Sequence, residues 1–235
     1  MKNVITCKNC SGENPYFSLI CGNCRAYLRD RVVNIDLWKT VGGLIESPVK
    51  AFSDIIHAEH KNFIFFLSFL IGIKFFINAL ILSEPVFKGT QVFSHAVAVF
   101  FSSIGAVLLI AALFSLLFTS FTKAFRVNTR YKDNFSFFIY SQIPHVFALV
   151  FLFPVELVLF GGFLFSSNPS PFLLKPTPAY TMAAMEGIMF LWSLVLGFWA
   201  VYAATRAKMY SFLVTLLYNI ITAGVVLGIA AAFSY

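Results

Sequence analysis

The sequence predicts an all-α membrane protein with five transmembrane helices, preceded by amphipathic juxtamembrane helices and a small zinc-ribbon head. Three observations predict this fold class. The chain has 235 residues, of which 59% are hydrophobic and only 11% are charged, whereas soluble domains carry about 25% charged residues. Five long apolar stretches follow residue 62, and a helix needs roughly 20 such residues to cross a bilayer. All 4 cysteines lie in two CxxC pairs near the N-terminus.

The cysteine pairs predict a zinc-binding head over residues 1–30. Ten residues separate the pairs, and this spacing lets four thiolates reach one tetrahedral Zn2+; the ligands would be Cys7, Cys10, Cys21 and Cys24. Two disulfides are an alternative, but a reducing cytoplasm disfavours them. A redox CxxC is another, but two pairs flanking a short polar turn fit a metal better. Four protein ligands leave no open position for a substrate, so the expected zinc is structural.

Residues 31–61 are expected to form an amphipathic juxtamembrane arm. Apolar residues recur on one helical face from Leu37 to Ile45, and again after the Ser47-Pro48 start signal. Two helices lying at the cytoplasmic interface would explain this pattern, and packing on the head or on the loops is the alternative. The segment His57-Ala-Glu59-His60 has neither the spacing nor the order of the metalloprotease motif HExxH. It predicts a solvated or interfacial face.

The five-span membrane domain is expected over residues 62–235. Each apolar stretch must be helical, because unpaired backbone groups are costly in lipid; the stretches are 63–82, 95–121, 135–165, 179–204 and 210–233. The third contains Pro144 and Pro154. A cut at Pro154 would leave about 12 residues, too few to cross. We therefore expect one tilted or kinked third helix.

The positions of lysine and arginine predict the orientation. Eight of them precede the first span, four lie in the second connection and two in the fourth, while the other connections hold only Lys88 and Lys175. Because connections rich in lysine and arginine stay on the cytoplasmic side, the N-terminus is expected inside and the C-terminus outside, in a bacterial inner membrane. The net charge of +7 is then expected to face anionic lipid head groups, and nucleic acid is not an expected partner.

Three ionisable residues fall inside the predicted spans, where charge is costly and often functional. They are Lys74, Glu156 and Glu186. We expect Lys74 to pair with one of the two glutamates, and snorkelling of Lys74 alone is the alternative. Other polar residues of the spans are expected to form interhelical hydrogen bonds, with a proton relay through the histidines as the alternative; these are Asn78, His95, His145 and Asn219.

Small residues repeat at every fourth position of the last span. Gly224, Gly228 and Ala232 would make one face nearly smooth, so that a neighbouring helix can approach closely. Packing within the chain is the expected use of this face, and a homodimer interface is the alternative.

Several short motifs resemble known families. Residues 7–24 are similar to the short zinc ribbons of bacterial N-termini, with Ser11 and Arg25 in place of the usual glycines. The arm LWKTVGGLIESPVKAFSDII is similar to a helix with the pattern P-x-x-x-F, and FFIYSQIP to a Tyr-Ser-x-x-Pro span opening. With five spans, residues 36–235 thereby resemble the Yip family of Ypt/Rab-interacting membrane proteins. The resemblance implies a role in membrane organisation and carries no catalytic residues.

Two functions remain open from the sequence. The first is a non-enzymatic adaptor, or membrane-organising protein, whose zinc head and basic arm recruit an unknown protein partner. The second is a small transporter or channel lined by Lys74, Glu156 and Glu186 and by the proline-containing third helix, although no inverted repeat is visible. An intramembrane hydrolase would need a Ser–Lys, paired-Asp or HExxH set, and we find none.

Overall fold

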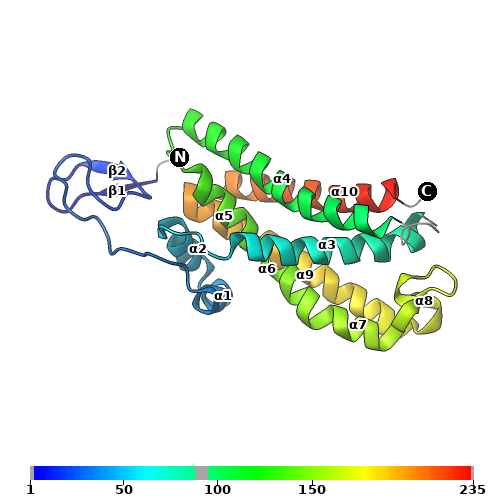
Figure 1. Ribbon diagram of the computed structural model, residues 1–235. Helices are drawn as coiled ribbons and strands as arrows, with labels where there is room; N and C mark the ends of the chain where they lie inside the picture. The colour runs from blue at the N-terminus through cyan, green and yellow to red at the C-terminus, as the bar shows by residue number, and fades with distance from the viewer. Residues whose placement is uncertain (1–2, 88–94, 234–235) are drawn as a thin grey trace. The chain divides into compact units, whose positions relative to one another are not determined.

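The computed structural model describes residues 3–87 and 95–233 (Figure 1). Its elements in chain order are β1 Val4–Thr6, β2 Glu13–Pro15, α1 Leu37–Glu46, α2 Pro48–His57, α3 Ile64–Phe87, α4 Ala96–Ala124, α5 Tyr131–Ser141, α6 Ile143–Phe147, the π-helix η1 Ala148–Leu152, α7 Phe153–Phe160, the 3-10 helix η2 Gly161–Phe165, α8 Pro171–Leu174, α9 Pro176–Thr205 and α10 Lys208–Ala232. The chain forms two compact units. The first unit is Met1–Phe65, Ala111–Ser141 and Val195–Leu216, and the second is Phe66–Ile110, Gln142–Leu194 and Leu217–Tyr235.

Within residues 3–87 and 95–233, five helical segments are long and apolar enough to cross a membrane. They are Ile64–Ser83, Ala96–Ala124, Ile143–Phe165, Pro176–Thr205 and Lys208–Ala232, which confirms the five predicted spans and indicates an integral membrane protein. Hydroxyl groups within these helices bond back to their own backbone: Ser103 Oγ donates to the Val99 carbonyl at 2.8 Å, and Thr122 Oγ1 to the Phe118 carbonyl at 2.8 Å. Such bonds satisfy polar groups where lipid offers no partner.

The third apolar run differs from its prediction. We expected one helix from residue 135, but α5 ends at Ser141 and Gln142 leaves the helical conformation, with φ −90° and ψ 7°. Pro144 accounts for the break, because it has no N–H to bond the carbonyl four residues earlier and its ring crowds that carbonyl. Ahead of Pro154 the helix widens into η1, where the Phe153 N–H bonds to the Ala148 carbonyl five residues back. The third span is therefore Ile143–Phe165, and α5 is a separate helix.

Helices α1 and α2 form where the amphipathic pattern predicted helices. Asp36 caps α1 by accepting the Lys39 N–H at 3.0 Å, and Pro48 begins α2. Phe52 and Ile55 of α2 are fully buried, and α2 packs against α1 and α5. In α1, by contrast, Trp38 is 83% exposed. The juxtamembrane placement of both helices stays a prediction.

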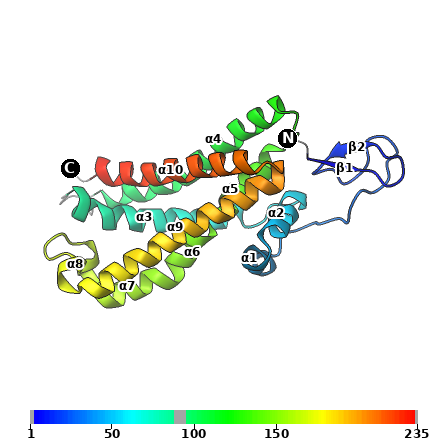
Figure 2. The same ribbon diagram turned by 180° about the vertical axis from the view of Figure 1, so that it is seen from behind.

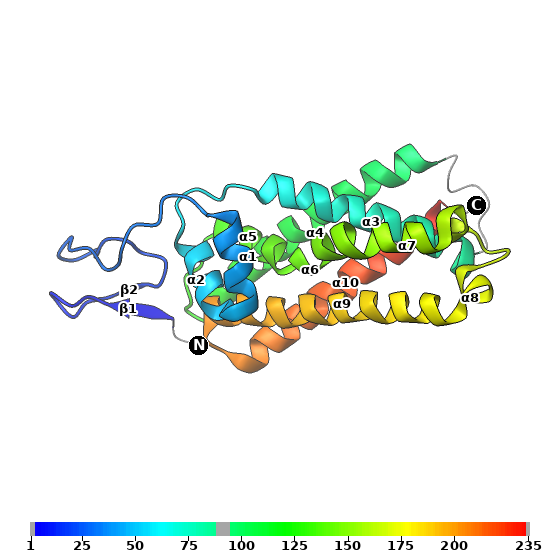
Figure 3. The same ribbon diagram turned by 90° about the horizontal axis from the view of Figure 1, so that it is seen from below.

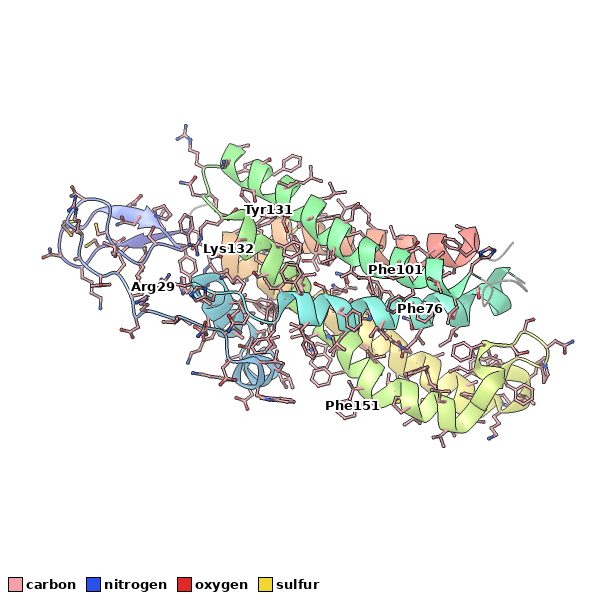
Figure 4. All side chains as sticks on the ribbon, in the orientation of Figure 1. Arg29, Phe76, Phe101, Tyr131, Lys132 and Phe151 are labelled. Atoms are coloured by element: carbon pink, nitrogen blue, oxygen red, sulfur yellow. The ribbon has the colours of Figure 1, made fainter. Side chains whose placement is uncertain are left out.

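Close helix packing occurs at two glycines that the sequence analysis did not select. A Cβ on Gly72 of α3 would lie 2.7 Å from Ile104 Cγ1 and 3.0 Å from Ile104 Cα in α4. A Cβ on Gly197 of α9 would lie 2.6 Å from Thr215 Cγ2 in α10. Beside Gly72, the rings of Phe76 (labelled in Figure 4) and Phe100 meet edge to face with their centroids 5.5 Å apart. Only a residue without a side chain allows backbones to approach this closely.

The predicted packing face of the last span is not used within the described part of the chain. A Cβ on Gly224 or Gly228 would have no neighbour within 4 Å, and Ala232 is exposed. The expectation of packing within the chain at these residues is therefore wrong. The repeat made the face smooth, but the rotation of α10 turns it away from its neighbours. Figure 3 shows α9 and α10 as continuous helices joined by a short turn.

The core of the second unit includes the junction between α7, η2 and α9. Phe160, Leu164 and Ala179 form a buried cluster there, and Figures 1 and 2 show α7 beside the first half of α9. The Phe147 ring stacks on Trp192 with centroids 5.5 Å apart. These contacts hold the π-containing third span against the fourth, and so position the charged residues that both helices carry.

Candidate metal centre and buried charge clusters

The four cysteines come together as the sequence predicted. Their sulfur atoms all lie within 4.8 Å of one another, and none forms a disulfide. Sγ of Cys7 is 3.5 Å from that of Cys24, and Sγ of Cys10 is 3.6 Å from that of Cys21. Zinc bound to sulfur at about 2.3 Å in a tetrahedron would hold the sulfurs roughly 3.8 Å apart. The cluster can therefore hold a metal ion, and its donor set and spacing suit Zn2+.

The backbone around each CxxC pair repeats the same turn. The backbone carbonyl of Cys7 accepts the Ser11 N–H at 2.9 Å, and the backbone carbonyl of Cys21 accepts the Arg25 N–H at 3.1 Å. Ser11 and Arg25 have φ angles of 57° and 60°, the left-handed region that glycine adopts most easily. Each residue directly follows the second cysteine of a pair, and both adopt the same left-handed conformation.

Asn14 ties the two turns together. Its Oδ1 accepts the Gly22 N–H at 2.9 Å, and its Nδ2 donates to the Gly12 carbonyl at 2.9 Å and to Cys21 Sγ at 3.4 Å. The antiparallel pair of β1 and β2 holds Asn14 opposite Ile5. A buried amide that bonds both turns and one sulfur helps to hold the four sulfur atoms close together.

Backbone N–H groups favour the metal-binding form of the cysteines. The N–H groups of Cys24 and Asn23 donate to the sulfur of Cys21 and lower its pKa to about 6. The N–H of Ala26 acts on Cys24 in the same way and lowers the pKa of that thiol. Because the thiolate is the form that binds metal, these turns favour that form at Cys21 and Cys24, whereas the hydrogen bond to Cys24 raises the pKa of Cys10 to about 11.

The cysteine head contacts other elements of the first unit. Asn3 Nδ2 donates to the backbone carbonyls of Ala203 and Ala204, at 3.2 and 2.6 Å, near the end of α9. Tyr16 Oη lies 2.6 Å from Ser53 Oγ of α2. The Arg130 guanidinium lies over the Phe17 ring at 4.6 Å. The head is therefore joined to the end of α9, to the middle of α2 and to the residue before α5.

His57 lies in this junction rather than on a solvated face. Its Nε2 is 3.1 Å from the Tyr16 carbonyl oxygen, and its ring centroid lies 4.8 Å from that of Tyr16. Burial, followed by the positive charge of Arg29, lowers the pKa of His57 to about 4. Figure 4 labels Arg29 beside the head. The neutral imidazole thus belongs to the contact between the head and α2.

A second charge cluster, centred on Asp133, was missed by the sequence analysis. The buried carboxylate is 3.0 Å from Lys61 Nζ and 2.7 Å from Arg130 Nε. Both cations also donate to carbonyls at the end of α2: Lys61 to Ile55 and Ile56, and Arg130 to Ile56 at 3.2 Å. Burial lowers the pKa of Lys61 to about 8 although Asp133 favours its charge. The sequence did contain a signal for this cluster, because Asp133 is the single acidic residue in a connection that carries four basic ones.

The ionisable residues of the spans form a third cluster in the second unit. Lys74 is fully buried, and its Nζ lies 2.6 Å from Glu186 Oε1. Glu186 is thus the glutamate that pairs with Lys74. Glu156 is only 6% exposed, and its Oε2 has no hydrogen-bond partner. It lies within electrostatic range of both Lys74 and Glu186.

The polar residues predicted as interhelical links behave differently from one another. Asn219 Oδ1 accepts the Ser193 hydroxyl at 2.9 Å and the Gln142 amide at 3.4 Å, which confirms it as a link between helices. His145 is buried with its Nδ1 unbonded, and its ring meets Phe75 edge-on with centroids 5.4 Å apart. His95 lies near the Phe233 ring, with centroids 6.1 Å apart.

Comparisons with known proteins give no match. No family model matches the chain, and neither the curated proteins nor the solved structures contain a match to it.

Proposed function

We propose that the chain is a non-enzymatic membrane adaptor whose head is folded by structural zinc and presents a surface to a cytoplasmic protein partner. The observation that carries the proposal is the closed set of four cysteine sulfurs within 4.8 Å of one another, joined to a chain with five membrane-spanning helices. A head of about 25 residues buries too little apolar surface to fold alone, so metal binding would supply its folding free energy.

The contacts of the head support a presenting role. Asn3, Tyr16 and Phe17 contact the rest of the first unit, whereas Tyr27 is 74% exposed and Ile20 is 46% exposed. One side of the head would thus be fixed and the other available. The lysine and arginine bias supports a cytoplasmic position for this head in a bacterial cell, and the resemblance to the Yip family adds a role in membrane organisation to the proposal.

Metal analysis and crosslinking test the adaptor together. The protein purified in detergent is expected to hold one zinc per chain by mass spectrometry, and Cys21→Ser is expected to lose it, while the matched control Ser18→Ala keeps it. A photo-crosslinking residue at Tyr27 is expected to capture one discrete protein in cells, and Cys21→Ser should abolish that adduct. The same probe at Val158, an 86% exposed span residue, serves as the control. Zinc without any head-dependent adduct would refute the adaptor.

A second candidate, a small transporter or channel, rests on the buried Lys74–Glu186 pair and the unbonded Glu156 beside it. Broken helices and buried charges are typical of transport paths. Flux through vesicles containing the purified protein, abolished by Lys74→Met, would favour this candidate over the adaptor.

A further inference from the structure

The cluster of Lys74, Glu156 and Glu186 has an unbalanced charge. Each residue lies within a membrane-spanning segment, and two carboxylates face one ammonium. The ammonium is already engaged, because Lys74 Nζ lies 2.6 Å from Glu186 Oε1. If all three groups were ionised, the cluster would carry one net negative charge where lipid and buried protein stabilise it poorly.

Glu156 is the group that would carry this excess negative charge. Its side chain is 6% exposed, and Oε2 has no hydrogen-bond partner. A carboxylate in that environment normally finds several donors. The charged groups within electrostatic range of Glu156 are Lys74 from α3 and Glu186 from α9. From α6, His145 is in electrostatic contact with the same Lys74, and no other ionisable group of the described residues acts on Glu156.

We propose that Glu156 binds one exchangeable proton, so that Lys74, Glu186 and Glu156 together form an intramembrane proton-binding site. The bound proton makes the cluster neutral: the ammonium balances Glu186, and Glu156 is a carboxylic acid. The step is a simple acid–base exchange, in which the carboxylate takes a proton from hydronium and returns it to water. An O–H bond forms at Glu156 and one breaks in hydronium.

The local backbone supplies a place where the proton can move. The π-helix η1 ends at Leu152, four residues before Glu156, and Pro154 leaves a carbonyl of the preceding turn without its N–H donor. Such π segments are frequent at functional sites. Three turns earlier, His145 Nδ1 is buried without a partner.

Infrared difference spectroscopy on the full-length protein in lipid vesicles tests the site. Spectra recorded at about pH 6 and about pH 9, where ordinary carboxyl groups with a pKa near 4 stay ionised, are expected to differ by the C=O stretching band of one protonated carboxylic acid, and the band should shift in D2O because the proton exchanges. Glu156→Gln should remove the band and leave the thermal unfolding temperature nearly unchanged, since a glutamine has the shape of a protonated glutamate.

A second variant keeps the test decisive if Glu156→Gln unfolds. Glu186→Gln frees Lys74 to pair with Glu156, so the same band is expected to disappear near neutral pH although Glu156 is intact. A band that survives both substitutions would overturn the proposal. So would loss of the band in the unmodified protein on adding sodium chloride at fixed pH, because the ligand would then be Na+. The adaptor proposal is independent, because its readouts are zinc and the crosslink.

Discussion

Gly72→Ala tests whether α3 and α4 are held together by close backbone approach. The added Cβ would lie 2.7 Å from Ile104 Cγ1 and 3.0 Å from Ile104 Cα. Ordinary carbon–carbon contacts are about 3.5–4.0 Å, so the two helices would have to separate by several tenths of an ångström. The side-chain contact could be relieved by a rotamer change, but the contact with the Cα could not.

The expected magnitude follows from comparison with a matched glycine. Overpacking of a tight contact costs about 1–3 kcal/mol, while alanine in place of glycine favours a helix by up to about 1 kcal/mol. Gly105→Ala measures the gain in helix propensity alone, because a Cβ there meets no described atom within 4 Å. The difference between the two variants in free energy of unfolding is therefore expected to be about 1–3 kcal/mol, with Gly72→Ala the less stable.

Unfolding in mixed detergent micelles, titrated with SDS and followed by circular dichroism, would measure this difference. Gly228→Ala adds a second control, since its Cβ also has open space within the chain. If Gly72→Ala matched both controls within about 0.5 kcal/mol, the close approach would not exist in the protein and the arrangement of α3 and α4 would be wrong.

Two further predictions concern the first unit. Asp133→Asn should destabilise the protein by about 3–5 kcal/mol, because it leaves Lys61 buried without its charge partner. Adding Lys61→Met should restore most of the lost stability. Equal stability of the single and double variants in the same SDS titration would contradict the ion pair. Because the pKa of His57 is about 4 when folded and about 6.5 when unfolded, the unfolded state binds more protons between these values. Stability should therefore fall as the pH drops from about 6.5 to about 4, by about 2 kcal/mol after allowance for partial exposure. His57→Gln should flatten that dependence, and an unchanged pH profile of unfolding would argue against burial of the imidazole.

The features that could be predicted from the sequence depend on residues close together in the chain. The five spans follow from composition over about 20 residues, and the cysteine cluster follows from two pairs across one short turn. The conformation of Ser11 and Arg25 was not predictable from residue preference, since neither favours positive φ. Both residues nevertheless take the left-handed conformation, with closely matching φ angles of 57° and 60°.

The features that could not be predicted depend on how each helix is rotated about its axis. The sequence left two partners open for Lys74, and only the packed structure places Glu186 within 2.6 Å. The same applies to glycine: a repeat at Gly224 and Gly228 was a stronger pattern than the single Gly72, yet only Gly72 faces a neighbour. Burial of Asp133 likewise depends on two cations that are far apart in the chain.

The crowding of four sulfurs has a consequence for handling the protein. Cys7 and Cys24 lie 3.5 Å apart and Cys10 and Cys21 lie 3.6 Å apart, so an oxidant reaching the metal-free head would find thiol pairs already positioned to crosslink the two turns. Each crosslink would consume two ligands and prevent later loading with zinc. Preparations made without reductant or metal would then contain an oxidised head on intact spans, and would wrongly score as a protein that binds no metal.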